Sequence, residues 1–112
     1  MPGANFESAS YGLTICAERS GLVGANERGE RLFSSIAIST RAEAATVDEP
    51  TAPCGACRQL LYEASRLAGV DMEVILSNTN RDKIIVTTIS ELLPLAFSAV
   101  DLGIDVAKYR RK

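Results

Sequence analysis

The spacing of apolar side chains changes along the chain, and each change predicts a new structural element. Apolar residues recur at helical spacing between Thr14 and Ala25, which predicts a helix over residues 13–26. Residues 32–39 end in alternating and β-branched side chains, a pattern typical of a largely buried strand. Residues 40–53 are polar, contain two prolines and do not repeat, so a loop is expected there.

The second half of the chain begins with a helix and continues with two strands. The helix is expected over residues 54–67, directly after Pro53, and Gly69 supplies its stop signal. Residues 72–76 and 83–87 form two short apolar runs, and the six polar residues between them suffice for a hairpin loop. The two strands should therefore be antiparallel.

A last short helix is predicted by Thr88 and Glu91, which have the form of a capping box, and it should end near Pro94. Residues 96–112 show no persistent period. The order is thus helix, strand, helix, strand, strand and short helix, with no internal repeat and no linker. We expect one small α/β domain that occupies residues 1–112.

Composition and charge narrow the classes of partner. With 12 basic and 14 acidic side chains the net charge is −2, which does not favour a nucleic-acid polymer as partner. The basic run over residues 108–112 is typical of a solvated chain end. No stretch approaches the roughly 18 apolar residues that span a bilayer, and no leader pattern opens the chain. A cytoplasmic protein without a membrane partner is expected.

The three cysteines are the candidate chemistry. Cys54 and Cys57 form a Cys-x-x-Cys pair at a predicted helix start, where free backbone N–H groups favour the thiolate. Cys16 lies near the start of the other predicted helix. Three protein ligands and one open position are typical of catalytic zinc, and this chain has no histidine to serve as a fourth ligand. Glu18 would then lie close enough to move protons at the open position.

A Cys-x-x-Cys pair alone leaves a metal site, a redox dithiol and simple burial open. The full set is more informative. Zinc nucleobase deaminases carry a His or Cys, one residue, then Glu, followed later by Pro-Cys-x-x-Cys. The corresponding residues here are Cys16, Glu18, Pro53, Cys54 and Cys57. The pattern therefore favours one zinc ion per chain and hydrolytic deamination over a thiol redox pair.

Longer runs around these motifs resemble the small homotetrameric cytidine deaminases. The runs are residues 5–20 (NFESASYGLTICAERS), 53–61 (PCGACRQLL) and 90–97 (SELLPLAF). The resemblance covers nearly the whole chain. It implies a cytidine deaminase-like layered fold with a mixed sheet and helices, and a homotetramer. It also implies a hydrolase that converts cytidine or deoxycytidine to the uracil nucleoside and ammonia in pyrimidine salvage.

The resemblance assigns substrate contacts residue by residue. Asn5 and Glu7 match the pair that holds the ribose hydroxyls, and Ala9 matches a residue that offers backbone groups to the base. Phe97 matches an aromatic side chain that reaches from a neighbouring subunit to cover the pyrimidine. Each of these assignments is an expectation for this chain.

Arg19 and Arg58 match arginines that hydrogen-bond the cysteine ligands. Three thiolates around Zn²⁺ leave a net charge of −1, which nearby guanidinium groups would offset. Both arginines are therefore expected next to the metal site.

One departure concerns the start of the chain. Family members carry a helix and a strand hairpin upstream of the position of Asn5, so the domain is expected to be N-terminally truncated, with the strand at residues 32–39 left uncovered. Two alternatives to nucleoside deamination remain open. One is deamination of a cytosine-bearing antibiotic such as blasticidin, and the other is a catalytically impaired zinc-binding deaminase fragment.

Overall fold

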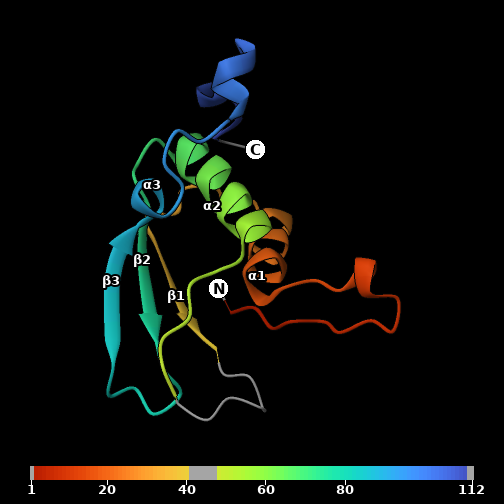
Figure 1. Ribbon diagram of the computed structural model, residues 1–112. Coiled ribbons are helices and arrows are strands. Elements are labelled where there is room, and N and C mark those ends of the chain that lie inside the picture. Colours follow the sequence, from red (N-terminus) through yellow and green to blue (C-terminus); the bar gives the residue numbers. More distant parts are fainter. Residues whose placement is uncertain (1, 41–47, 111–112) are drawn as a thin grey trace.

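The computed structural model describes residues 2–40 and 48–110. Figure 1 shows a sheet with two longer helices beside it and a chain end that projects beyond α2. The elements in chain order are η1 (Tyr11–Leu13), α1 (Ala17–Glu27), β1 (Ser35–Ser39), α2 (Gly55–Ala68), β2 (Glu73–Ser77), β3 (Ile84–Thr88), α3 (Ile89–Leu92), η2 (Ala99–Leu102) and η3 (Val106–Tyr109). The elements named η are 3-10 helices.

The strands of the described residues form a mixed sheet in the order β1-β2-β3. β1 and β2 are parallel and are connected through α2, while β2 and β3 form an antiparallel hairpin. The prediction of an antiparallel pair is therefore confirmed. Ala37, Ile75 and Val86 lie side by side across the sheet, which fixes the register.

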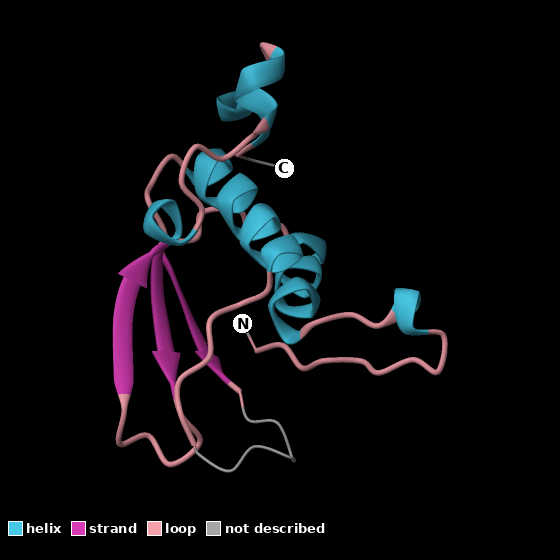
Figure 2. Ribbon diagram, viewed as in Figure 1, coloured by secondary structure: helices cyan, strands magenta, loops and turns pink. Residues whose placement is uncertain are grey.

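Both longer helices cover the same face of the sheet, where the core lies (Figures 1 and 2). On α2, Cys57, Leu61 and Ser65 are buried and lie four residues apart, so one stripe of this helix faces inward. The buried cluster consists of Ile38, Leu61, Met72, Val74, Leu76 and Ile89. α2 is thereby held firmly against the sheet, and its first turn is fixed in place.

The described residues leave the opposite face of the sheet open. Val86 lies there at 60% exposure, beside the half-buried Ile75 and the exposed Ala37. Ile84, on the same face, is 59% exposed. Among the described strands, nothing pairs with the outer edge of β1 or β3. As expected from the sequence, apolar side chains of the sheet remain accessible to other chains.

The predicted boundaries of two elements are wrong at the N-terminal end. α1 begins at Ala17 rather than at Leu13, because Ile15 exchanges two backbone hydrogen bonds with Phe6, at 2.8 and 3.0 Å. This bridge keeps residues 14–16 extended. β1 begins at Ser35 rather than at Leu32. The predictions for α2, β2 and β3 lie within one residue of the observed limits.

Residues 96–110 contain η2 and η3 and continue past the end of α2. The C-terminal segment is attached to α2 by Arg110, whose guanidinium group donates to the carbonyl oxygen of Leu67. Gly69 ends α2 in the left-handed conformation, at φ 79°. Within the described part of the chain, no helix combines the length and apolar character that a bilayer crossing needs.

Candidate metal centre

The site lies where the N-termini of α1 and α2 meet. Cys16 and Cys54 are the N-cap residues of these helices, and both have extended backbones, with ψ of 155° and 169°. Cys57 follows in the first turn of α2 and is fully buried. The two helix starts thus bring together three thiols from residues 41 positions apart in the chain, Cys16 to Cys57.

The three sulfur atoms lie within 4.8 Å of one another. Tetrahedral zinc with Zn–S bonds of about 2.3 Å requires sulfur atoms roughly 3.8 Å apart, so small side-chain adjustments would complete the site. All three cysteines are free thiols. An all-sulfur donor set suits zinc better than a hard cation such as magnesium. The residues present therefore fit zinc.

The thiols of the α2 pair differ in acidity. The pKa of Cys54 is lowered, mainly because the backbone N–H of Cys57 hydrogen-bonds its sulfur. The pKa of Cys57 is raised far above its ordinary value, first because burial disfavours the thiolate and then because Cys54 and Glu18 lie next to it. Cys54 is therefore the first of these two thiols to ionise, and a bound cation is what would ionise Cys57.

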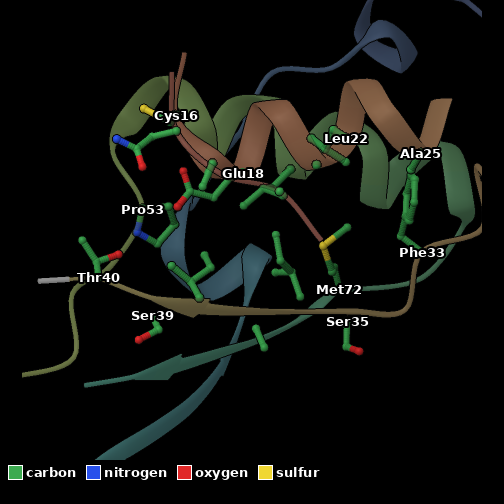
Figure 3. A pocket seen from close by; sticks show the side chains of 18 of the residues that line it. Cys16, Glu18, Leu22, Ala25, Phe33, Ser35, Ser39, Thr40, Pro53 and Met72 are labelled. Carbon is green, nitrogen blue, oxygen red and sulfur yellow. The ribbon is translucent and has the colours of Figure 1, made fainter. Parts of the chain in front are cut away.

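Glu18 lies beside the sulfur atoms. It occupies the first turn of α1 and its carboxylate is within hydrogen-bond reach of the Cys57 thiol. Glu18, Cys16 and Cys54 line one end of a cavity of about 910 Å³ between α1 and β1. Figure 3 shows the Glu18 carboxylate pointing into this cavity near Cys16 and Pro53. A proton-accepting group and two metal-binding sulfurs thus line one space, and the sulfur of the buried Cys57 lies within 4.8 Å of the other two.

Asn5 and Glu7 line the same cavity. The side-chain amide of Asn5 donates to Glu7 Oε1 at 2.7 Å, so the two side chains act as a pair. The second carboxylate oxygen of Glu7 and the amide oxygen of Asn5 remain available as acceptors. The structure therefore brings these two predicted substrate contacts to the cysteines.

Ala9 and Phe97 lie elsewhere. Neither is among the described residues that line the cavity, and both are exposed, Phe97 at 56%. The backbone carbonyl of Phe97 instead accepts a hydrogen bond from Gln59 on α2, at 2.7 Å. Phe97 of one chain thus does not cover the cavity of that same chain.

Both predicted arginines lie near the site and donate to backbone carbonyl groups. Arg58 donates to the oxygens of Pro53 and Leu92, each at 2.8 Å, while Arg19 donates to Thr14 at 3.0 Å. Within the described residues these are the side-chain hydrogen bonds of the two arginines, and the predicted bonds to sulfur stay predictions. Arg58 holds the residue directly before Cys54, so it fixes the start of α2.

Sequence reasoning gave Gln59 no role, although it lies in the run PCGACRQLL. Its amide reaches a residue 38 positions later in the chain, which no local pattern indicates. A glutamine on the exposed side of a helix is an ordinary surface residue in most proteins. Only its partner in the folded chain distinguishes it.

Comparison with known proteins adds a further line of evidence. The family model described as "Cytidine and deoxycytidylate deaminase zinc-binding region" matches residues 1–72. The chain is 47% identical over 101 residues to a cytidine deaminase of Halalkalibacterium halodurans, covering 90% of this chain and 70% of that protein. It is 40% identical over 101 residues to a cytidine deaminase of Sporosarcina psychrophila, covering 90% of this chain and 68% of that one.

The fold is also similar to a solved structure. The crystal structure of a cytidine deaminase from Burkholderia pseudomallei matches with a TM-score of 0.70 and 39% sequence identity. The match covers 85% of this chain and 69% of that chain. The layered arrangement predicted from the sequence is therefore confirmed.

Proposed function

Because the chain belongs to the cytidine and deoxycytidylate deaminase zinc-binding family, we infer that it is an enzyme that deaminates cytidine hydrolytically with the help of zinc. The observation that carries this inference is that three thiols gather within 4.8 Å of one another, and that two of them line one cavity together with Glu18. Uridine and ammonia would be the products, and the same site would accept deoxycytidine. The proposal includes a role in pyrimidine salvage and a location in the cytoplasm.

Cys16, Cys54 and Cys57 would hold one zinc ion per chain. When bound, zinc supplies Lewis acidity, which lowers the pKa of water at the site toward about 7. The lowered pKa of Cys54 supports its role as a ligand that ionises before Cys57. The donor set leaves a fourth position for water, as a hydrolytic reaction requires.

Glu18 would carry the protons. Its carboxylate accepts a proton from the attacking water and gives it to the ring nitrogen next to the reacting carbon. It then accepts a second proton, from the hydroxyl group now on that carbon, and gives it to the leaving amine. A C–O bond forms, the C–N bond breaks, and ammonia leaves with the proton that Glu18 returned. The position of Glu18 at the cavity end that holds the cysteines supports this role.

Asn5 and Glu7 would bind the ribose, because sugar hydroxyls both donate and accept hydrogen bonds. The contact between the two side chains supports the assignment, since it orients the amide and leaves acceptors facing the cavity. Ala9 would contribute backbone groups to the base. Arg19 and Arg58 would offset the negative charge of the thiolate site while they hold the helix starts.

Phe97 would act in the cavity of a neighbouring chain, so that a homo-oligomer, and by resemblance a tetramer, would be the active form. Its exposure supports this assignment, and so does its absence from the described residues that line the cavity of its own chain. The open sheet face supports association as well, because Ile84 and Val86 stay accessible. The sequence holds three tyrosines but no tryptophan, so Phe97→Trp introduces a single tryptophan that can be excited selectively. Its emission should shift to shorter wavelength as the chain concentration rises through the assembly range.

One experiment tests zinc, assembly and activity together. The purified protein should contain about one zinc ion per chain and should have the mass of an oligomer by light scattering. It should also cause the absorbance of cytidine to fall as the substrate is consumed. Deoxycytidine, free cytosine and blasticidin form the substrate panel that separates a nucleoside deaminase from an antibiotic deaminase. A zinc-loaded chain that turns over none of these would reduce the protein to a metal-binding deaminase fragment. A monodisperse 12.0 kDa monomer with full turnover would refute the role of Phe97 between chains.

A further inference from the structure

Two consecutive residues of α2 hold the segment that carries Phe97. Directly after Cys57, Arg58 donates to the carbonyl oxygen of Leu92 at 2.8 Å. The next residue, Gln59, donates to the carbonyl oxygen of Phe97 at 2.7 Å. Both ends of residues 92–97 are therefore attached to the helix turn that presents the metal-binding cysteine.

The backbone between these two attachments is strained. Leu95 has φ 54°, in the left-handed region that a bulky side chain avoids, and its side chain is fully exposed. Neither the conformation nor the exposure stabilises the chain by itself. Such outliers persist where the surroundings determine them, and they gather at functional sites. Here the hydrogen bonds from Arg58 and Gln59 hold the turn at Leu95 in this conformation.

We propose that Gln59 is a positioning residue that directs the Phe97 side chain toward the active site of a second copy of the chain. This inference rests on the proposed role of Phe97. A hydrogen bond to the carbonyl group of Phe97 fixes its peptide plane and thereby the direction in which its side chain leaves the backbone. The same nitrogen of Gln59 also donates to Glu63, one helix turn later, over the longer distance of 3.3 Å.

The location of Gln59 separates its effect from those of the zinc ligands. Gln59 is not among the described residues that line the cavity, and its side chain hydrogen-bonds Glu63 and the carbonyl of Phe97. Loss of its donor should therefore release Phe97 without changing metal binding. A single net hydrogen bond of ordinary strength corresponds to roughly a 2- to 12-fold change in an equilibrium constant.

The test is a double-mutant cycle on the full-length, zinc-loaded protein. Gln59→Glu keeps the size and the helix propensity of the side chain but replaces the donating nitrogen by an oxygen. It should raise the KM for cytidine roughly 2- to 12-fold with kcat and zinc content kept. Gln59→Lys restores a donor at this position and should recover most of the lost affinity. Glu63→Ala removes the other partner of Gln59 and serves as the control with unchanged KM.

The outcomes separate this proposal from the function on which it rests. In the Phe97→Ala background, Gln59→Glu should change KM less than about 2-fold, because the residue that it positions is gone. Equal effects of Gln59→Glu in both backgrounds would overturn the positioning role. If Phe97→Ala alone left KM unchanged, the role of Phe97 would fail, and the positioning role with it.

A second readout does not depend on catalysis. Gln59→Glu should speed amide hydrogen exchange in residues 93–98, and Glu63→Ala should not. Unchanged exchange in the Gln59 variant would show that the bond does not hold the turn, whatever the activity of the protein.

Discussion

Replacing Glu18 by glutamine separates proton transfer from metal binding. Glu18 is the second residue of α1, and its carboxylate faces the cavity end formed by the cysteines. Glutamine has the same shape and can still accept a hydrogen bond, but it cannot take up a proton in this pH range. The change therefore removes the proposed proton carrier while it leaves the cavity filled as before.

The structure allows the competing effects to be compared. Loss of proton transfer should lower kcat by about 10²- to 10⁴-fold, which corresponds to about 3–5 kcal/mol in the activation barrier. Loss of a negative charge in the first turn of α1 should cost only about 0.3–1 kcal/mol of folding stability. Zinc binding should not weaken, because Glu18 contributes to the raised pKa of the Cys57 thiol. Removal of this charge lowers that pKa and eases the loss of the proton that zinc must displace.

The assay measures kcat from cytidine absorbance, zinc content after gel filtration, and the thermal midpoint of unfolding. Glu30→Gln is the matched control, because Glu30 lines the same cavity, is exposed, and belongs to the loop after α1. It should leave all three quantities unchanged. Near-normal turnover by Glu18→Gln would refute the assigned role, and a loss of zinc with the loss of activity would place Glu18 among the ligands.

The remaining predictions concern thiol reactivity, the start of α2 and the core. In the zinc-free protein, iodoacetamide should modify Cys54 before Cys57 and below the usual thiol pH range, because the pKa of Cys54 is lowered and that of Cys57 is raised. Zinc should protect Cys54, and equal labelling of these two thiols would contradict this. Arg58→Ala should lower the free energy of unfolding in urea by about 2–4 kcal/mol and should lower kcat as well, because the carbonyl groups of Pro53 and Leu92 lose their donor. Unchanged stability would show that these bonds are weak. Leu61→Ala should cost about 2–5 kcal/mol, whereas Leu102→Ala, at 66% exposure, should change stability little.

Local signals in the sequence predicted most of the elements. Thr88 caps α3 by accepting from the backbone N–H of Glu91 at 3.4 Å, as the capping-box pattern indicates. The side chain of Glu91, however, bonds the hydroxyl of Thr87 rather than returning to the cap residue. The zinc residues were predictable as well, because the reaction requires particular residue types at fixed short spacings.

Contacts between distant segments could not be predicted in this way. Asp48 accepts from the backbone N–H groups of Thr79 and Asn80, both at 3.0 Å, and so attaches the loop before α2 to the β2–β3 turn. The bond from Gln59 to Phe97 is of the same kind. These contacts join polar side chains to backbone atoms more than 30 positions away, where spacing carries no signal. The start of α1 was missed because the backbone bridge between Phe6 and Ile15 also joins residues that no local pattern connects.

The outer strand β3 affects whether newly made chains aggregate before they assemble. β3 reads IIVTT, an edge segment of high β-propensity in which Ile84, Ile85 and Val86 are all at least half exposed. Such a segment can template fibrous stacking between identical chains. The charged residues 81–83 directly precede this segment and oppose such stacking, and Lys83 also pairs with Glu49. Rapid expression at high temperature should therefore favour insoluble aggregates, whereas slow expression at low temperature should favour soluble oligomers.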